Sequence, residues 1–156
     1  MTPEFQLVQR LAGRKLTLAL AESCTGGMVA RRVTAIAGAS AVFIGGIVCY
    51  ANAVKRDLLG VPQAVLDTRG AVSRETAILL AENVRALLGA DLSAAVTGIA
   101  GPDGGSVDKP VGLVHIATVG PIGRVARGYV FSGNREVIRR QACATVLSML
   151  LEQVCV

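Results

Sequence analysis

The stretch LTLALAESCTGG, at residues 16–27, joins a short apolar run to a polar turn that ends in two adjacent glycines. The apolar run predicts a buried strand at residues 16–21. Beyond the turn, Val29, Val33 and Ile36 fall on one face of a predicted helix. A strand, a turn and a helix in this order are typical of α/β domains.

The chain continues this alternation of helices and strands. Capping residues and periodicity predict a helix from Thr2 to Gly13, strands at 43–50 and 92–97, helices at 51–59 and from Ser73 to Gly89, and a helical turn opened by Pro62. The predicted buried face of the longest of these helices consists of Ala77, Leu80, Ala81, Val84, Leu87 and Leu88. Alternating strands and helices favour a sheet with helices on both faces.

The C-terminal part departs from this alternation. Residues 112–119 and 124–131 are two strand-like runs joined by the sequence GPIG, which predicts a β-hairpin. Asn134 then caps a terminal helix that is basic at its start and apolar nearly all round at 142–151, so that it is buried in the domain or in a subunit interface. The whole pattern predicts one domain over residues 1–156, with a three-layer α/β/α fold, a mixed, mostly parallel sheet, and a C-terminal hairpin plus helix.

Composition and charge narrow the classes of function. With 156 residues, 52% of them hydrophobic and 17% charged, the chain can bury a core and is not disordered. The net charge of +5 would suit a nucleic acid, an anionic membrane surface or an anionic small molecule. The basic residues are scattered, without a Lys/Arg run or interleaved aromatic residues, so we expect no nucleic-acid surface. An anionic small molecule is the favoured partner.

Residues 33–54 carry no charge and are long enough to span a membrane. The Gly45-Gly46 pair, the polar residues inside this stretch and the basic pairs at both ends favour a helix end, a turn and a buried strand instead.

The four cysteines form no CxxC pair and His115 is the only histidine, which argues against a zinc cluster. Because no signal peptide is recognised, the cysteines are expected to be reduced thiols in a cytoplasmic protein.

Two glycine-containing segments follow predicted strands, where α/β proteins place their ligands. In ESCTGG, at residues 22–27, backbone N–H groups at a helix start can hold a phosphate or an oxyanion, and the hydroxyl or thiol is a candidate nucleophile. In TGIAGPDGG, at residues 97–105, four glycines expose further N–H donors in a loop that runs on to Pro110. The structural alternatives are a capping turn for the first segment and a connection without function for the second.

A third candidate is YANAVK, at residues 50–55, where a predicted strand ends. A partly desolvated lysine such as Lys55 can act as the base for a serine, with the hydroxyl of Tyr50 as proton relay or oxyanion donor. The structural alternative is a surface lysine beside a half-buried tyrosine. His115 is interpreted as a strand residue rather than a catalyst.

Seven stretches, in order along nearly the whole chain, resemble the CinA C-terminal-domain family: AESCTGG (21–27), GGIVCYANAVK (45–55), LGV (59–61), GAVS (70–73), TGIAGPDGG (97–105), KPVGLV (109–114) and FSGNREVIRRQA (131–142). This family includes nicotinamide-nucleotide amidohydrolases. The resemblance implies hydrolysis of the carboxamide of nicotinamide mononucleotide to nicotinic acid mononucleotide and ammonia, without a metal or cofactor.

The resemblance also implies roles for individual residues. Ser23 would be the nucleophile, Lys55 its base and Tyr50 the assisting hydroxyl. The residues expected to bind substrate are Thr25, Gly26, Gly27, Thr97, Gly98, Gly101, Gly104 and Gly105, with Arg135 or Arg139 as a phosphate clamp. Reasoning from the residues leaves Cys24 open as an alternative nucleophile.

Full-length CinA proteins carry a further N-terminal domain associated with pyrophosphatase activity, and the chain resembles the stand-alone form. The apolar C-terminal helix and the resemblance together favour a homodimer. Two other functions stay open: a nucleotide-binding module without catalysis, and, from the family's association with competence and DNA damage, an interaction protein in DNA uptake or repair.

Overall fold

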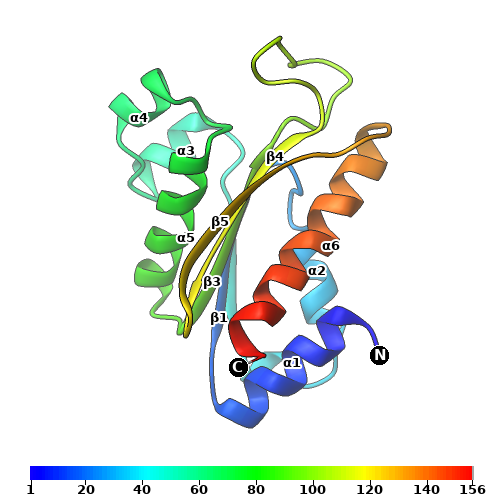
Figure 1. The fold of residues 1–156 in the computed structure, drawn as a ribbon. Coiled ribbons are helices and arrows are strands. Elements are labelled where there is room, and N and C mark those ends of the chain that lie inside the picture. The colour runs from blue at the N-terminus through cyan, green and yellow to red at the C-terminus, as the bar shows by residue number, and fades with distance from the viewer. Residues whose placement is uncertain (156) are drawn as a thin grey trace.

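The computed structural model describes residues 1–155, in which five strands form one sheet between two layers of helices (Figure 1). In chain order the elements are α1 (Pro3–Arg14), β1 (Leu18–Glu22), α2 (Met28–Thr34), the 3-10 helix η1 (Ala39–Ala41), β2 (Phe43–Val48), α3 (Asn52–Asp57), α4 (Gln63–Thr68), α5 (Arg74–Leu88), β3 (Leu92–Gly98), β4 (Leu113–Gly120), β5 (Gly123–Val130) and α6 (Arg135–Val154). The predicted α/β/α architecture is confirmed.

The sheet is mixed and has the strand order β2-β1-β3-β4-β5. β1 pairs in parallel with β2 and β3, and Glu22 at its end lies opposite Val48 and Val96. β4 runs antiparallel to β3 and forms the predicted hairpin with β5. The carboxyl ends of the three parallel strands β2, β1 and β3 therefore lie side by side.

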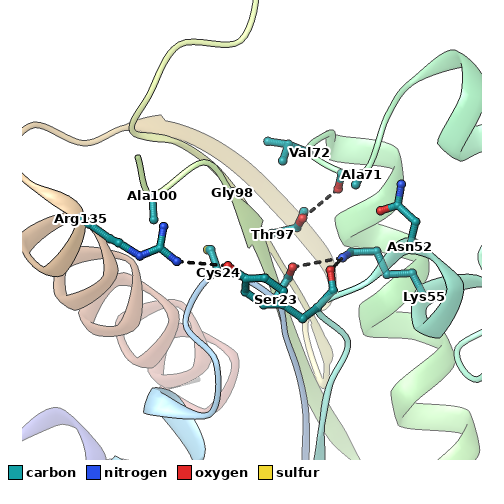
Figure 2. A pocket seen from close by; sticks show the side chains of 11 residues that line it. Ser23, Cys24, Asn52, Lys55, Ala71, Val72, Thr97, Gly98, Ala100 and Arg135 are labelled. Carbon is teal, nitrogen blue, oxygen red and sulfur yellow. Dashed lines mark hydrogen bonds between the residues drawn. The ribbon is translucent and has the colours of Figure 1, made fainter. Parts of the chain in front are cut away.

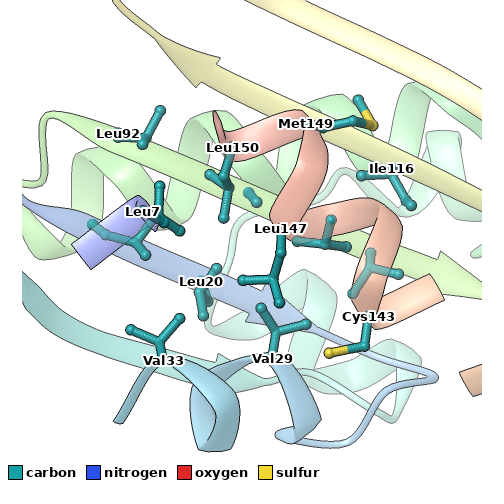
Figure 3. Close-up of a cluster of buried hydrophobic side chains, with 14 of the residues drawn as sticks. Leu7, Leu20, Val29, Val33, Leu92, Ile116, Cys143, Leu147, Met149 and Leu150 are labelled. Carbon is teal, nitrogen blue, oxygen red and sulfur yellow. The ribbon is translucent and has the colours of Figure 1, made fainter. Parts of the chain in front are cut away.

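Each face of the sheet carries its own hydrophobic cluster, and helices cover both. On one face α5 packs on small side chains, among them Ala19, Ala95 and Ala117. On the other face α1, α2 and α6 pack with larger side chains such as Leu20 and Leu147 (Figure 3). A core of Ala, Val and Leu thus forms with few aromatic residues.

Three local features differ from the predicted elements. α1 continues through Gly13 and ends where Lys15 adopts a left-handed conformation with φ 56°. β2 is an edge strand rather than a buried one, since only β1 lies beside it, and Ile44 and Val48 are exposed. The buried residues of α5 end at Val84, and Leu87, expected on the buried face, is exposed.

α6 is buried within the domain. Its buried apolar residues are Ile138, Ala142, Cys143, Val146, Leu147, Met149, Leu150 and Val154. Ala144 and Ser148 face solvent on the opposite side of the helix. The apolar character of α6 is therefore explained without a subunit interface, and it does not by itself support the expected homodimer.

The uncharged stretch at residues 33–54 forms the end of α2, then η1 and β2, and the beginning of α3. Within the described part of the chain, no helix is both long and apolar enough to cross a membrane. The four cysteines are free, with Cys155 exposed and the other three buried.

Gly112 closes the long loop between β3 and β4, and its position requires glycine. Its φ of +95° is left-handed, and a Cβ there would overlap the carbonyl oxygen of Phe131. We therefore expect Gly112→Ala to lower the free energy of unfolding by about 4 kcal/mol or more, as measured by urea denaturation.

Gly123, in the hairpin turn, is a matched control for this substitution. Its φ of +94° is nearly the same, but apart from its chain neighbours no atom of the described residues lies within 4 Å of its Cβ position. Gly123→Ala should therefore lower the free energy of unfolding by only about 1–2 kcal/mol, which is the cost of a left-handed backbone at alanine. Equal losses in the two variants would contradict the steric explanation for Gly112.

Candidate active site

A cavity of about 220 Å³ lies at the carboxyl ends of β1 and β3 (Figure 2). These strands are parallel neighbours, and the chain leaves them in opposite directions, from β1 toward β2 and from β3 toward β4. Ligands of open α/β sheets bind at such a switch point. The cavity is lined by Ser23, Cys24, Tyr50, Asn52, Lys55, Ala71, Val72, Thr97, Gly98, Ala100 and Arg135. Residues from all three candidate segments therefore meet in one place.

Ser23 and Lys55, the predicted nucleophile and base, are in contact. Ser23 directly follows β1, and its backbone N–H donates to the carbonyl of Val96 on β3 (2.9 Å). Lys55 extends from α3 and places its Nζ 3.1 Å from the Oγ of Ser23. The same Nζ donates to the carbonyl oxygens of Cys49 (2.7 Å) and Tyr50 (2.9 Å), which follow β2. The ends of three parallel strands thus fix the amine against the hydroxyl.

Burial makes the amine of Lys55 easier to deprotonate than a lysine in water. The residue is 1% exposed, and burial lowers the pKa of its amine below the ordinary 10.5. Among residues 1–155 it forms no ion pair with a carboxylate. A neutral amine has two N–H groups and one lone pair. When the carbonyls of Cys49 and Tyr50 accept both N–H groups, the lone pair faces the hydroxyl of Ser23 and can accept its proton.

A buried carboxylate holds the turn that follows β1. Glu22 accepts hydrogen bonds from the hydroxyl of Thr25 (2.6 Å) and from the backbone N–H groups of Val29 (2.9 Å) and Ala30 (3.0 Å). These donors at the start of α2 already have a protein acceptor, so they do not offer the phosphate site that the sequence suggested. The turn residues predicted to bind substrate lie outside the cavity lining, namely Thr25, Gly26 and Gly27.

Other backbone N–H groups close to the nucleophile remain available. The N–H of Gly26 donates to the carbonyl of Ser23 (3.1 Å), but those of Cys24 and Thr25 have no acceptor in the described chain. In α/β hydrolases the N–H of the residue after the nucleophile stabilises the oxyanion. Ala100, in the cavity lining, likewise has an N–H without an acceptor among the described residues. Cys24 and Ala100 line the cavity, so their N–H groups are candidate donors to negative charge on a substrate carbonyl.

Cys24 lies beside Ser23 in the cavity lining but is the weaker candidate nucleophile. Burial raises the pKa of its thiol to about 11, so the thiol stays protonated near neutral pH. Lys55 contacts the hydroxyl of Ser23, and no hydrogen bond within residues 1–155 joins its Nζ to the sulfur. The geometry therefore favours Ser23.

Tyr50 and Arg135 meet at the exposed rim of the cavity. The tyrosine is 59% exposed, and its hydroxyl accepts a hydrogen bond from Nη2 of Arg135 (3.1 Å). Nη1 of the same arginine donates to the carbonyl of Gly101 (2.8 Å), which itself lies outside the lining. In the described chain no hydrogen bond joins the tyrosine hydroxyl to Ser23 or Lys55. The hydroxyl therefore lies at the rim of the cavity, and the assisting role of Tyr50 stays a prediction.

The long glycine loop contributes its first residues to the site. Thr97 and Gly98, at the end of β3, line the cavity, and the hydroxyl of Thr97 donates to the carbonyl of Ala71 (2.8 Å). Gly104 and Gly105 line a separate hollow within the loop itself. This loop projects beyond the end of the sheet (Figure 1), and the predicted glycines Gly101, Gly104 and Gly105 lie outside the lining of the cavity that contains Ser23.

The structure separates the two arginines that were predicted as alternative phosphate clamps. Arg135 lines the cavity. Arg139, one helical turn later, lies outside the lining, and its guanidinium is bound to the backbone carbonyls of Cys24 and Thr25 and to Glu136. Of these two arginines, Arg135 is the one that lines the cavity.

Four residues of the lining were not among the predicted site residues: Asn52, Ala71, Val72 and Ala100. Asn52 lies inside the segment YANAVK and Ala100 inside the glycine loop, so their motifs contained a signal. Ala71 and Val72 belong to GAVS, where local pattern shows only the capping serine of α5. Their place in the cavity follows from packing alone.

His115 lies outside the cavity lining, on β4 opposite Thr97. Burial lowers the pKa of its imidazole, which favours the neutral form. The described residues contain no group of three or more His, Cys, Asp or Glu side chains that could hold a metal ion.

Fold and site together define a three-layer α/β domain that carries a buried serine–lysine pair at the switch point of its sheet. Residues 2–154 match the CinA C-terminal domain, and the chain belongs to this family. The expected family is thereby confirmed.

Individual relatives agree with this assignment. A CinA-like protein of Geobacter sulfurreducens is 53% identical over 92% of the chain, and one of Anaeromyxobacter dehalogenans is 51% identical over the same share. The chain spans only 35% of the length of either relative. Among solved structures, a competence/damage-inducible protein of Agrobacterium tumefaciens has a TM-score of 0.91 at 42% identity, covering 98% of this chain and 96% of that one. A CinA superfamily protein of Klebsiella pneumoniae has a TM-score of 0.93 at 30% identity, covering 97% and 95%.

Proposed function

We propose that the protein is a nicotinamide-nucleotide amidohydrolase, which converts nicotinamide mononucleotide and water to nicotinic acid mononucleotide and ammonia. One observation carries the proposal: Nζ of Lys55 lies 3.1 Å from Oγ of Ser23 while two backbone carbonyls accept its other hydrogen bonds. This arrangement supplies an activated nucleophile for acyl transfer. The choice of this amide rests on the resemblance of the site motifs to those of the family.

The residues of the site support a two-step reaction. Lys55 takes the proton of Ser23 while Oγ attacks the carboxamide carbon, and free N–H groups such as that of Cys24 stabilise the oxyanion. As the C–N bond breaks, protonated Lys55 gives its proton to the leaving nitrogen, which departs as ammonia. Water then attacks the acyl-enzyme, with Lys55 as base, and releases the acid and free Ser23.

The size of the cavity indicates how the nucleotide would lie. A volume of about 220 Å³ is below the roughly 300–1,000 Å³ of typical ligand pockets, so it suits only part of a nucleotide. We place the nicotinamide ring inside, enclosed by small side chains such as Ala71 and Val72. The phosphate then lies at the rim beside the exposed guanidinium of Arg135.

The direct test is an assay of ammonia and nicotinic acid mononucleotide released from nicotinamide mononucleotide. We expect the two products in equal amounts. Binding of the nucleotide without release of ammonia would contradict the proposal and favour a nucleotide-binding module. Retention on DNA at physiological salt, with no ammonia released, would favour the interaction protein instead.

Arg135 provides a second prediction about this reaction. A charge-assisted hydrogen bond to phosphate stabilises the complex by about 1.5–3 kcal/mol, so Arg135→Gln should raise KM about 10- to 100-fold and change kcat much less. Steady-state kinetics with the nucleotide measure this effect. With nicotinamide riboside, which lacks the phosphate, the variant and the wild type should differ little. An equal loss on both substrates would show that Arg135 does not bind phosphate.

A further inference from the structure

Arg139 connects the last helix to the turn that contains the nucleophile. Its Nε donates to the carbonyl of Cys24 (3.0 Å), and its Nη2 donates to the carbonyl of Thr25 (3.1 Å). The third nitrogen, Nη1, donates to Glu136 on the same helix (3.4 Å). All three nitrogens of the guanidinium therefore have protein acceptors, which leaves this arginine poorly suited to bind a ligand.

The two carbonyls held by Arg139 fix the direction of two peptide groups. In a trans peptide the C=O and the following N–H point in opposite directions. Orienting the carbonyl of Cys24 therefore orients the N–H of Thr25, and orienting the carbonyl of Thr25 orients the N–H of Gly26. The N–H of Gly26 donates to the carbonyl of Ser23 (3.1 Å), whereas that of Thr25 has no acceptor among the described residues. Arg139 thus holds two successive peptide groups of the turn that begins at Ser23.

The turn is held from a second direction as well. Glu22 binds the hydroxyl of Thr25 (2.6 Å), so the side chain and the carbonyl of this residue are restrained by groups of opposite charge. A Cβ at position 26 would come within 3.4 Å of Nη2 of Arg139, and φ there is +57°. The left-handed φ favours glycine at position 26, next to the carbonyl of Thr25 that Arg139 binds.

We propose that Arg139 is a positioning residue, which holds the turn at residues 23–26 in the geometry that presents Ser23 and Cys24, with its backbone N–H, to the substrate. The inference rests on the proposed amidohydrolase function. Arg139 acts through the backbone of the turn, and the phosphate is bound by Arg135.

Steady-state kinetics of Arg139→Met distinguish a residue that positions the turn from one that binds the substrate. Methionine keeps most of the aliphatic stem but has no donor, so we expect kcat to fall about 10- to 100-fold while KM stays within about twofold. Arg139→Lys should recover part of kcat, because its ammonium group can bind one of the two carbonyls. It cannot reproduce the planar guanidinium that donates to both carbonyls at once. Arg140→Gln is the matched control, since Arg140 is exposed on the same helix, binds Glu136 and no other of the described residues, and should behave as the wild type. A higher KM with unchanged kcat in Arg139→Met would make Arg139 a substrate ligand and overturn the inference.

A second readout separates this inference from the proposed function. The rate at which a sulfonyl fluoride modifies Ser23, followed by intact mass, depends on the nucleophile and the oxyanion donors and needs no amide substrate. We expect modification to slow about 10-fold or more in Arg139→Met, with an unchanged urea midpoint showing that the variant is folded. If Arg139→Met does not fold, Arg139→Lys is judged by the same rates. Slower labelling together with no ammonia release by the wild type would reject the amidohydrolase and keep the positioning role. Equal labelling rates, or no labelling of wild-type Ser23, would overturn the positioning role.

Discussion

Replacing Ser23 with alanine is expected to lower ammonia release by about 10³-fold or more, because no acyl-enzyme can form without Oγ. The same substitution removes one of the three hydrogen-bond partners of the Lys55 amine. The amine still donates to the carbonyls of Cys49 and Tyr50. We therefore expect Ser23→Ala to fold normally and to bind the nucleotide. Product release measured over hours, and nucleotide affinity measured by calorimetry, check both statements.

Cys24→Ala is the matched control for Ser23→Ala. The two residues are adjacent and both line the cavity, but the pKa of the Cys24 thiol is raised to about 11 and its sulfur forms no hydrogen bond with Lys55 in the described chain. Most of the activity should remain in this variant. Loss of activity in Cys24→Ala with retention in Ser23→Ala would make Cys24 the nucleophile.

Lys55→Met is expected to lower kcat by about 10²- to 10⁴-fold, the usual contribution of a general base. Methionine fits the space of the aliphatic stem but accepts no proton from Ser23. Wild-type kcat should rise with pH as Lys55 loses its proton, with an apparent pKa below 10.5 because burial disfavours the charged amine. The variant should lose this dependence. Recovery of its activity at high pH alone would contradict the role of Lys55 as base.

The same pKa shift predicts how stability depends on pH. Between the lowered pKa of folded Lys55 and the ordinary 10.5 of the unfolded chain, the unfolded state binds more protons than the folded state. The free energy of unfolding therefore gains a contribution that rises with pH through this window. Below the window both states are protonated, and the full cost of burying the charge remains. Urea unfolding at several pH values should show this rise in the wild type relative to Lys55→Met, and parallel curves would contradict it.

The order of elements could be predicted because each depends on local pattern. The proline and Thr2 cap of α1, the Ser73 cap and Gly89 end of α5, and the GPIG hairpin turn are all read from short stretches of sequence. Whether a strand lies at the centre or the edge of a sheet depends on distant partners. For that reason β2 was expected to be buried, and only the strand order shows that one of its sides is unpaired.

By itself, the sequence determined the fold class and placed Ser23, Tyr50, Lys55 and Thr97 at the ends of predicted strands, where α/β proteins bind ligands. The resemblance to the family implied the roles of these residues. Only the tertiary structure decided what each side chain contacts. Arg135 and Arg139 are four residues apart on α6, a rise of about 6 Å along the helix, and both are plausible from sequence as phosphate ligands. The packing of α6 against α2 and the sheet places the first at the rim of the cavity and the second on the carbonyls of the nucleophile turn. Hydrogen bonds act over about 3 Å, so a shift of one helical turn is enough to change the partner and the role.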